Sequence, residues 1–195
     1  MRKTKKLIYV FFTTLLLVGG AFNVDSENNA NSIDNLKVMT IPNQGIERER
    51  IDVGSFSIEI PADWNLVESE ATEKGYNFAI KGECSSVFCT NLIGTQYDVG
   101  SAVDFNSFCT NWLAEAQLSQ FGIEYNGYTK PKNSAFDILL YKYSFTQSDV
   151  NILGLSYLID FKNSWWVLTF MSEYNGSMKR DFINTTNKVI ESIKI

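Results

Sequence analysis

Two consecutive segments near the carboxyl end are apolar on both alternating faces, and this feature restricts the fold more than any other. Residues 152–161 (ILGLSYLIDF) and 165–172 (WWVLTFMS) are expected to be strands, and hydrophobic side chains occupy both parities for much of their length. A strand that is hydrophobic on both sides is covered on both sides. We therefore expect a sheet with helices on both of its faces.

Shorter segments with a period of two extend this sheet. In residues 55–60, Phe56, Ile58 and Ile60 alternate with polar side chains, which indicates a strand with one wet face. Pro61 suits a turn, after which residues 64–69 are expected to form a hairpin with the first strand. The further strands that we expect are residues 75–82, 87–99, 123–128 and 136–145.

Two segments have helical periodicity instead. In residues 101–121, large apolar side chains recur at spacings of three and four, and Ser101 with Asp104 resembles a capping box. Residues 177–195 have a second apolar stripe and Ser177 as a natural N-cap. The order β-β-β-β-α-β-β-β-β-α has mostly short connections, so it predicts an α+β fold: an α-β-α sandwich with a mainly antiparallel central sheet flanked by helices.

The amino-terminal residues predict export. Residues 1–21 begin with basic side chains, continue with an apolar run over residues 7–18, and end in a small-x-small pattern at Gly19 and Ala21. This is typical of a signal peptide, and the alternative is an uncleaved N-terminal anchor. Residues 22–50 are polar and Asn-rich, so we expect a flexible linker before a folded domain at 51–195. Both alternatives place that domain outside the cytoplasm, secreted or in the cell envelope.

The charge distribution limits the partners. Of 17 basic residues, four lie in the first 21 positions, whereas all 22 acidic residues follow them. A region with 13 basic and 22 acidic residues is repelled by phosphate backbones and by anionic lipid. We expect no nucleic-acid partner, and membrane contact only through an uncleaved N-terminal segment.

The chain has no histidine, and this narrows its chemistry. A Ser-His-Asp or Cys-His arrangement and the usual zinc ligand are both excluded. There is also no Gly-rich phosphate loop. We expect no catalytic centre, no metal and no cofactor. The remaining enzymatic alternative is a hydrolase with paired carboxylates, Glu59 with Glu68 or Asp137 with Asp160.

Three cysteines remain to be assigned. Cys84 and Cys89 flank a predicted turn between two strands, which predicts a hairpin disulfide in an exported protein. Cys109 lies beside the buried stripe of the first helix and is expected to be a small buried apolar side chain. The alternative is that Cys109 pairs with one of the other two.

An exposed recognition patch is expected where the strand at 123–128 ends. It comprises Tyr125 and Tyr128 together with Lys130 and Lys132 of the following loop. The pair Trp165-Trp166 is a less attractive ligand platform. Because neighbouring strand residues point to opposite faces, we expect core packing for both tryptophans.

The two ends of the folded region resemble PsbP-like domains. The segment Phe56-Ser57-Ile58-Glu59-Ile60-Pro61-Ala62-Asp63-Trp64 resembles their opening strand followed by Ile-x-Pro-x-x-Trp. The run Trp165–Phe170 and a last helix ending Val189–Ile193 are similar to their close. The family takes its name from extrinsic subunit P of photosystem II and shares a fold with Ran-binding nuclear import factors. The resemblance implies a bacterial exported member whose sandwich serves mainly in protein contacts, without a shared catalytic centre.

These observations predict a function class. The leading hypothesis is a non-catalytic extracytoplasmic module that binds a protein partner or helps to assemble an envelope complex. The alternative is a carrier of a small apolar ligand in a pocket between helix and sheet.

Overall fold

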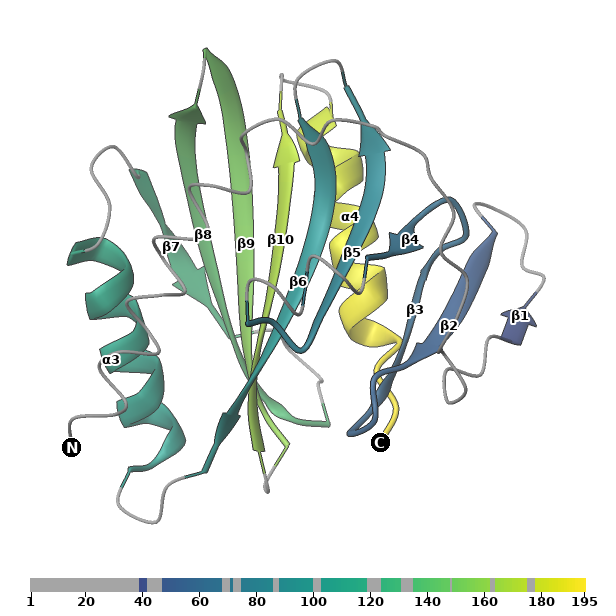
Figure 1. Cartoon of the computed structure of the whole chain (residues 1–195). Helices are drawn as coiled ribbons and strands as arrows, with labels where there is room; N and C mark the ends of the chain where they lie inside the picture. Colours follow the sequence, from purple (N-terminus) through teal and green to yellow (C-terminus); the bar gives the residue numbers. More distant parts are fainter. Residues whose placement is uncertain are drawn as a thin grey trace.

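The computed structural model describes residues 39–41, 47–67, 71, 75–85, 88–99, 103–118, 124–130, 135–147, 149–161, 164–174 and 178–195. Figure 1 shows the labels of its helices and strands. The predicted signal peptide at 1–21 and most of the predicted linker lie outside the described residues. Within the described ranges, no helix has the length and hydropathy that a membrane span requires.

Seven antiparallel strands form the central sheet, in the order β4-β5-β6-β10-β9-β8-β7 (Figure 1). The strands are β4 (Asn65–Leu66), β5 (Phe78–Cys84), β6 (Cys89–Asp98), β7 (Glu124–Thr129), β8 (Asp137–Gln147), β9 (Val150–Asp160) and β10 (Ser164–Glu173). Every neighbouring pair in this sheet is antiparallel, so the predicted sheet type is confirmed.

A second, three-stranded sheet contains β1 (Met39–Ile41), β2 (Arg48–Asp52) and β3 (Ser57–Pro61). Ile58 and Ile60 of β3 are fully buried, as their alternation predicted. The predicted hairpin between β3 and the next strand is wrong, because β3 pairs with β2 and β4 pairs with β5 of the central sheet. The buried ring of Trp64 lies against Gly82 of β5, and this packing draws the chain into the central sheet after the turn.

The predicted linker ends earlier than residue 50. Both β1 and most of β2 lie within residues 22–50, so the expected boundary at residue 51 falls inside β2. The first three residues of β2 are the polar run Arg48-Glu49-Arg50, which carries no hydrophobic alternation. The strand β2 forms because its backbone pairs with that of β3. Hydrophobic periodicity in the sequence does not predict a strand of this kind.

Two helices cover opposite faces of the central sheet, which confirms the predicted sandwich. The helix α3 (Phe105–Leu118) packs on one face, and α4 (Met178–Glu191) packs on the other together with the second sheet. Figure 1 shows α3 at the left of the sheet and α4 behind it. We call these faces the α3 face and the α4 face.

The two neighbouring tryptophans divide between these faces, as expected of adjacent strand residues. Trp165 stacks on Phe108 of α3 with ring centroids 4.8 Å apart. Trp166 lies on the α4 face, edge-on to Phe56 at 5.0 Å. Both side chains are buried, so both belong to the core.

Glycines allow two aromatic rings to lie flat across the sheet. Phe78 pairs with Gly94, and Tyr143 pairs with Gly154 on the neighbouring strand. A Cβ atom at either glycine would overlap the partner ring. The absent side chain is therefore a packing requirement at both positions.

The cap of α3 differs from the predicted one. The Oδ1 atom of Asp104 accepts a hydrogen bond from the Ser107 amide at 2.8 Å, so Asp104 itself is the N-cap. This bond favours the ionised carboxylate and lowers the pKa of Asp104. The expected caps Ser101 and Ser177 lie outside the described residues.

Candidate interaction surface

The strand β7 forms one edge of the central sheet and contains a bulge. Tyr125 pairs with Tyr143, whereas Tyr128 pairs with Tyr141, so three steps along β7 match two along β8. Gly127 lies inside this bulge with a φ of 98°, a conformation that favours glycine. The extra residue shifts the alternation and places position 128 on the α3 face.

A side chain fastens the bulge to the next strand. The Nδ2 group of Asn126 donates hydrogen bonds to the Ser144 hydroxyl at 3.0 Å and to the Glu124 carbonyl at 3.1 Å. Both bonds fasten the N-terminal side of the bulge, at the level where Glu124 pairs with Ser144. Beyond the bulge, the position of Tyr128 is set by its pairing with Tyr141.

Tyr128 is the most exposed aromatic side chain of the described residues, with 61% of its surface accessible. Its ring lies edge-on to Tyr141, with centroids 6.2 Å apart, and Tyr141 stacks on Trp112 of α3 at 5.7 Å. The Tyr141 hydroxyl also donates a hydrogen bond to the Cys109 carbonyl at 3.3 Å. Two buried rings thus support an exposed one, which is the arrangement of an aromatic contact residue.

The predicted recognition patch is placed only in part. Lys130 follows β7 and is exposed, on the same edge as Tyr128. The side chain of Tyr125 and the whole of Lys132 lie outside the described part of the chain. We call Tyr128 and Lys130, with the supporting Tyr141, the Tyr128 surface.

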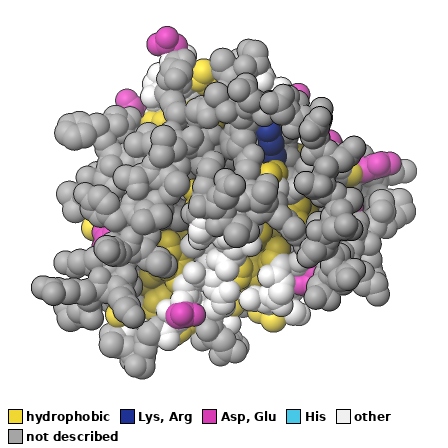
Figure 2. Space-filling model, in the orientation of Figure 1, with side chains coloured by type: hydrophobic (Ala, Val, Ile, Leu, Met, Phe, Trp, Pro, Cys, Tyr) yellow, Lys and Arg dark blue, Asp and Glu magenta, His cyan; other side chains and the backbone are white. Residues whose placement is uncertain are grey.

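In the view of Figure 2, hydrophobic side chains show mainly in the lower half, and the visible ionic side chains are mostly acidic.

The carboxylate pairs differ in their surroundings. Asp137 and Asp160 are direct partners across β8 and β9, as the hydrolase alternative required. Asp137 is exposed and Asp160 is half-buried. In the other pair, Glu59 is bound by Arg50, and Glu68 lies outside the described residues. Carboxylate catalysis at Asp137 and Asp160 remains a prediction.

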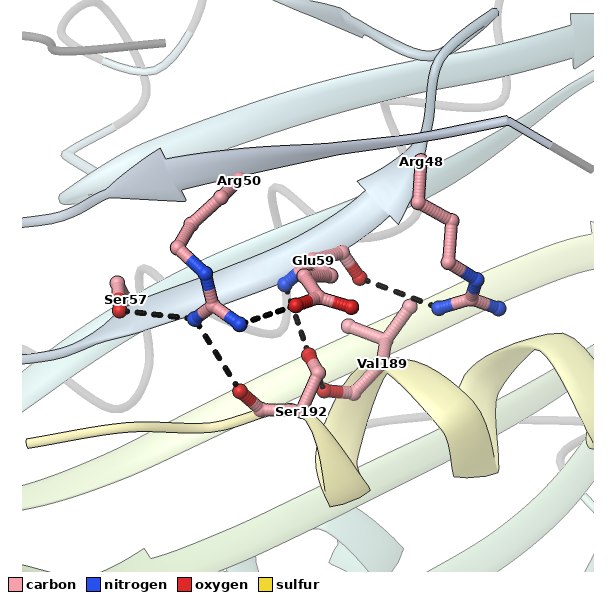
Figure 3. A network of polar contacts seen from close by, with 6 residues as sticks. All are labelled: Arg48, Arg50, Ser57, Glu59, Val189 and Ser192. Carbon is pink, nitrogen blue, oxygen red and sulfur yellow. Dashed lines mark hydrogen bonds and ion pairs between the residues drawn. The ribbon is translucent and has the colours of Figure 1, made fainter. Parts of the chain in front are cut away.

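A polar network joins the second sheet to the end of α4 (Figure 3). The guanidinium group of Arg50 binds the Glu59 carboxylate and donates to the Ser57 hydroxyl at 3.0 Å. It also donates to the Ser192 carbonyl at 3.4 Å, so a cation lies at the carboxyl end of the helix, where it is favourable.

Ser192 completes this Arg50 network. Its hydroxyl accepts a hydrogen bond from the Glu59 amide at 2.7 Å and donates one to the Val189 carbonyl at 2.6 Å. The backbone groups of Ser57 and Lys194 also bond to each other, at 2.8 and 3.0 Å. Because its members bind one another, we assign the network to structure rather than to ligand binding.

The cysteines are arranged as the leading interpretation expected. The sulfur atoms of Cys84 and Cys89 are 2.07 Å apart, at disulfide distance, and the two residues face each other across β5 and β6. Cys109 is free and buried, and its burial raises the pKa of the thiol to about 12. The alternative pairing of Cys109 is therefore absent. The described residues contain no group of three or more metal-ligating side chains.

The bulge in β7 is the feature that the sequence reasoning missed. The segment was expected to be a simple strand, in which Tyr125 and Tyr128 would lie on opposite faces. The available signal was Gly127, since a glycine inside a strand often marks a bulge.

No family model and no curated protein matches this sequence. Several solved structures do match. The solution structure of cyanobacterial PsbP (CyanoP) from Synechocystis aligns with a TM-score of 0.56 over 87% of this chain and 98% of that chain, at 10% identity. LpqN of Mycobacterium tuberculosis, described as involved in cell envelope biogenesis, aligns with a TM-score of 0.49 over 83% of this chain and 91% of that chain, at 14% identity. The first of these likenesses shows that the chain has a PsbP-like fold.

Proposed function

We propose that this PsbP-like chain is a non-catalytic extracytoplasmic module that binds a protein partner or helps to assemble an envelope complex. The observation that carries the proposal is Tyr128, an exposed aromatic ring held on a sheet edge by buried rings. The basic and then apolar segment at residues 1–21 supports the location. The absence of histidine supports the non-catalytic assignment.

The physics of the Tyr128 surface favours side-chain recognition. A tyrosine offers a large contact area with few rotatable bonds, so its immobilisation costs little entropy on binding. Its edge-on contact with Tyr141 restricts the ring further before any partner arrives. A bulged edge is a poor template for strand addition. We therefore assign the contact to the ring of Tyr128 and the adjacent Lys130 rather than to the backbone of β7.

Site-specific photo-crosslinking tests the proposal. A photoreactive phenylalanine analogue replaces Tyr128 in one variant and Asn184 in the control, and both are expressed in the native host. Asn184 is exposed on α4 and therefore lies on the opposite face of the domain. We expect one discrete cross-linked protein at position 128 and none at position 184. The captured protein, once purified, should bind the unmodified chain and lose affinity for the Tyr128→Ala variant.

Two outcomes contradict the proposal. One is an identical cross-linking pattern at both positions, which means that the Tyr128 surface is not selective. The other is turnover of a substrate by the purified chain that Asp137→Asn or Asp160→Asn abolishes without unfolding it. That result would make the carboxylate pair catalytic.

A further inference from the structure

The sequence Asn126-Gly127 places a reactive dipeptide inside the bulge of β7. Glycine has no side chain to shield its backbone nitrogen, so this nitrogen reaches the amide carbon of a preceding asparagine more easily than that of any other residue does. Among the described residues, Asn126 is the asparagine that glycine follows. The other Asn-Gly pair of the sequence, Asn175-Gly176, lies outside the described residues. The surroundings of Asn126 therefore decide whether the fold permits the reaction.

The strand pairing holds this dipeptide weakly. The register joins β7 to β8 up to Tyr125 and again from Tyr128 onward, whereas neither Asn126 nor Gly127 has a Cα partner in β8. A bulge leaves its extra residue unpaired and disrupts the ladder locally. The strand is also an edge of the sheet, so β8 is its one neighbour there. The backbone at this point can therefore rotate more easily than in the interior of the sheet.

There is room for the reaction around both residues. The side chain of Asn126 is exposed. A Cβ atom at Gly127 would have no heavy atom within 4 Å among the described residues beyond its chain neighbours. Because nothing described packs on this side of Gly127, a ring that forms between the two residues has space, and water reaches it without the movement of another element.

Two hydrogen bonds oppose the reaction. The Nδ2 group of Asn126 donates to the Ser144 hydroxyl at 3.0 Å and to the Glu124 carbonyl at 3.1 Å. Nδ2 is the atom that must leave as ammonia, so both bonds have to break first. Since neutral hydrogen bonds near water contribute little net free energy, they slow this loss without preventing it.

We propose that Asn126 is a site of spontaneous deamidation and that its hydrogen bond to Ser144 controls the rate. The backbone nitrogen of Gly127 attacks the Cγ atom of Asn126, and the new N–Cγ bond closes a succinimide ring. The Cγ–Nδ2 bond breaks, and ammonia leaves with the amide proton of Gly127. Water then opens the ring at either carbonyl, which gives aspartate or isoaspartate.

Either product alters the bulge. A carboxylate at position 126 has no proton to donate to the Glu124 carbonyl and repels it, and isoaspartate also places one more carbon atom in the backbone. We expect the N-terminal side of the bulge to loosen, since both side-chain bonds that fasten it are made by the lost Nδ2 group. The modification site does not depend on the protein partner proposed for the Tyr128 surface.

Peptide mapping by mass spectrometry tests the site on the purified full chain, incubated in mildly alkaline buffer. We expect residue 126 to convert to aspartate and isoaspartate, more slowly than in the synthetic peptide Glu124–Lys130, which has no fold. The Ser144→Ala variant should convert roughly two- to tenfold faster than the unmodified chain, because it removes one hydrogen bond on Nδ2. Tryptophan fluorescence shows whether this variant is folded, and conversion in the unmodified chain tests the site even if it is not.

The matched control is Asn151, which is exposed and bonded to the Thr146 hydroxyl at 2.9 Å but precedes isoleucine. We expect no conversion at Asn151, either in the unmodified chain or in Thr146→Ala. The proposal is overturned if Asn126 stays unconverted while the synthetic peptide reacts, or if folded Ser144→Ala converts no faster than the unmodified chain. Equal conversion at Asn126 and Asn151 also overturns it, since the reaction would then not depend on the glycine.

Discussion

Replacing Arg50 with alanine removes the centre of the polar network that joins the second sheet to α4. The guanidinium group binds the Glu59 carboxylate, the Ser57 hydroxyl at 3.0 Å and the Ser192 carbonyl at 3.4 Å. The variant leaves the Glu59 carboxylate without its cation. We therefore expect the Arg50→Ala variant to have a lower free energy of unfolding than the unmodified chain.

The magnitude follows from the exposure of the pair. The side chains of Arg50 and Glu59 are 13% and 24% exposed, so solvent screens their interaction only in part. A buried hydrogen bond to a charged group contributes about 1.5–3 kcal/mol, and an exposed ion pair about 0–1 kcal/mol. Together with the two weaker bonds, we expect a loss of about 2–3 kcal/mol in the free energy of unfolding. A domain of this size would then melt about 4–12 °C lower.

Urea unfolding followed by tryptophan fluorescence measures this loss. A double-mutant cycle with Glu59→Gln isolates the pair, and we expect a coupling energy of about 1 kcal/mol. The matched control is Arg180→Ala, since Arg180 is exposed on α4 and its removal should change stability by less than about 0.5 kcal/mol. If Arg50→Ala unfolds at the same urea concentration as Arg180→Ala, the network does not hold the second sheet to the helix.

Three other perturbations test the fold. Gly154→Ala should lower the free energy of unfolding by about 1–3 kcal/mol, because the new Cβ displaces the Tyr143 ring. An unchanged urea midpoint would contradict this packing. Reduction of the Cys84–Cys89 pair should lower the free energy of unfolding by about 2 kcal/mol, because the unfolded chain then regains the entropy of its short loop. Urea unfolding with and without reductant measures this loss, and equal urea midpoints would count against a disulfide. The lowered pKa of Asp104 adds stability above the pKa of an unfolded carboxyl, and this is lost as the pH falls through the folded pKa. Asp104→Asn should therefore flatten the dependence of stability on pH in acid, and an unchanged slope would refute the role of the cap.

The sequence was sufficient for the layers of the fold because they depend on local periodicity. The strand at 152–161 is apolar on both faces, and the structure covers it with α3 on one side and α4 on the other. The alternation of Phe56, Ile58 and Ile60 likewise predicted which side chains are buried. A wrong register would expose a whole set of hydrophobic side chains, so such patterns determine the fold strongly.

Strand partners were harder to predict, since backbone hydrogen bonds are the same for every strand. The polar β2 gives no hydrophobic signal, and its pairing with β3 replaced the expected hairpin. The disulfide pair was accessible from the sequence because Cys84 and Cys89 are close along the chain.

The candidate sites were decided by the tertiary structure. Sequence alone determined that Tyr128 and Lys130 stand two residues apart near the end of a strand, but the bulge at Gly127 decided the face on which Tyr128 lies. Side-chain contacts elsewhere follow the same rule: the Thr90 and Ser172 hydroxyls lie 2.9 Å apart because β6 pairs with β10, which is far from it in the chain. Local periodicity specifies which side chains are buried, whereas only the pairing of distant strands specifies which buried groups meet.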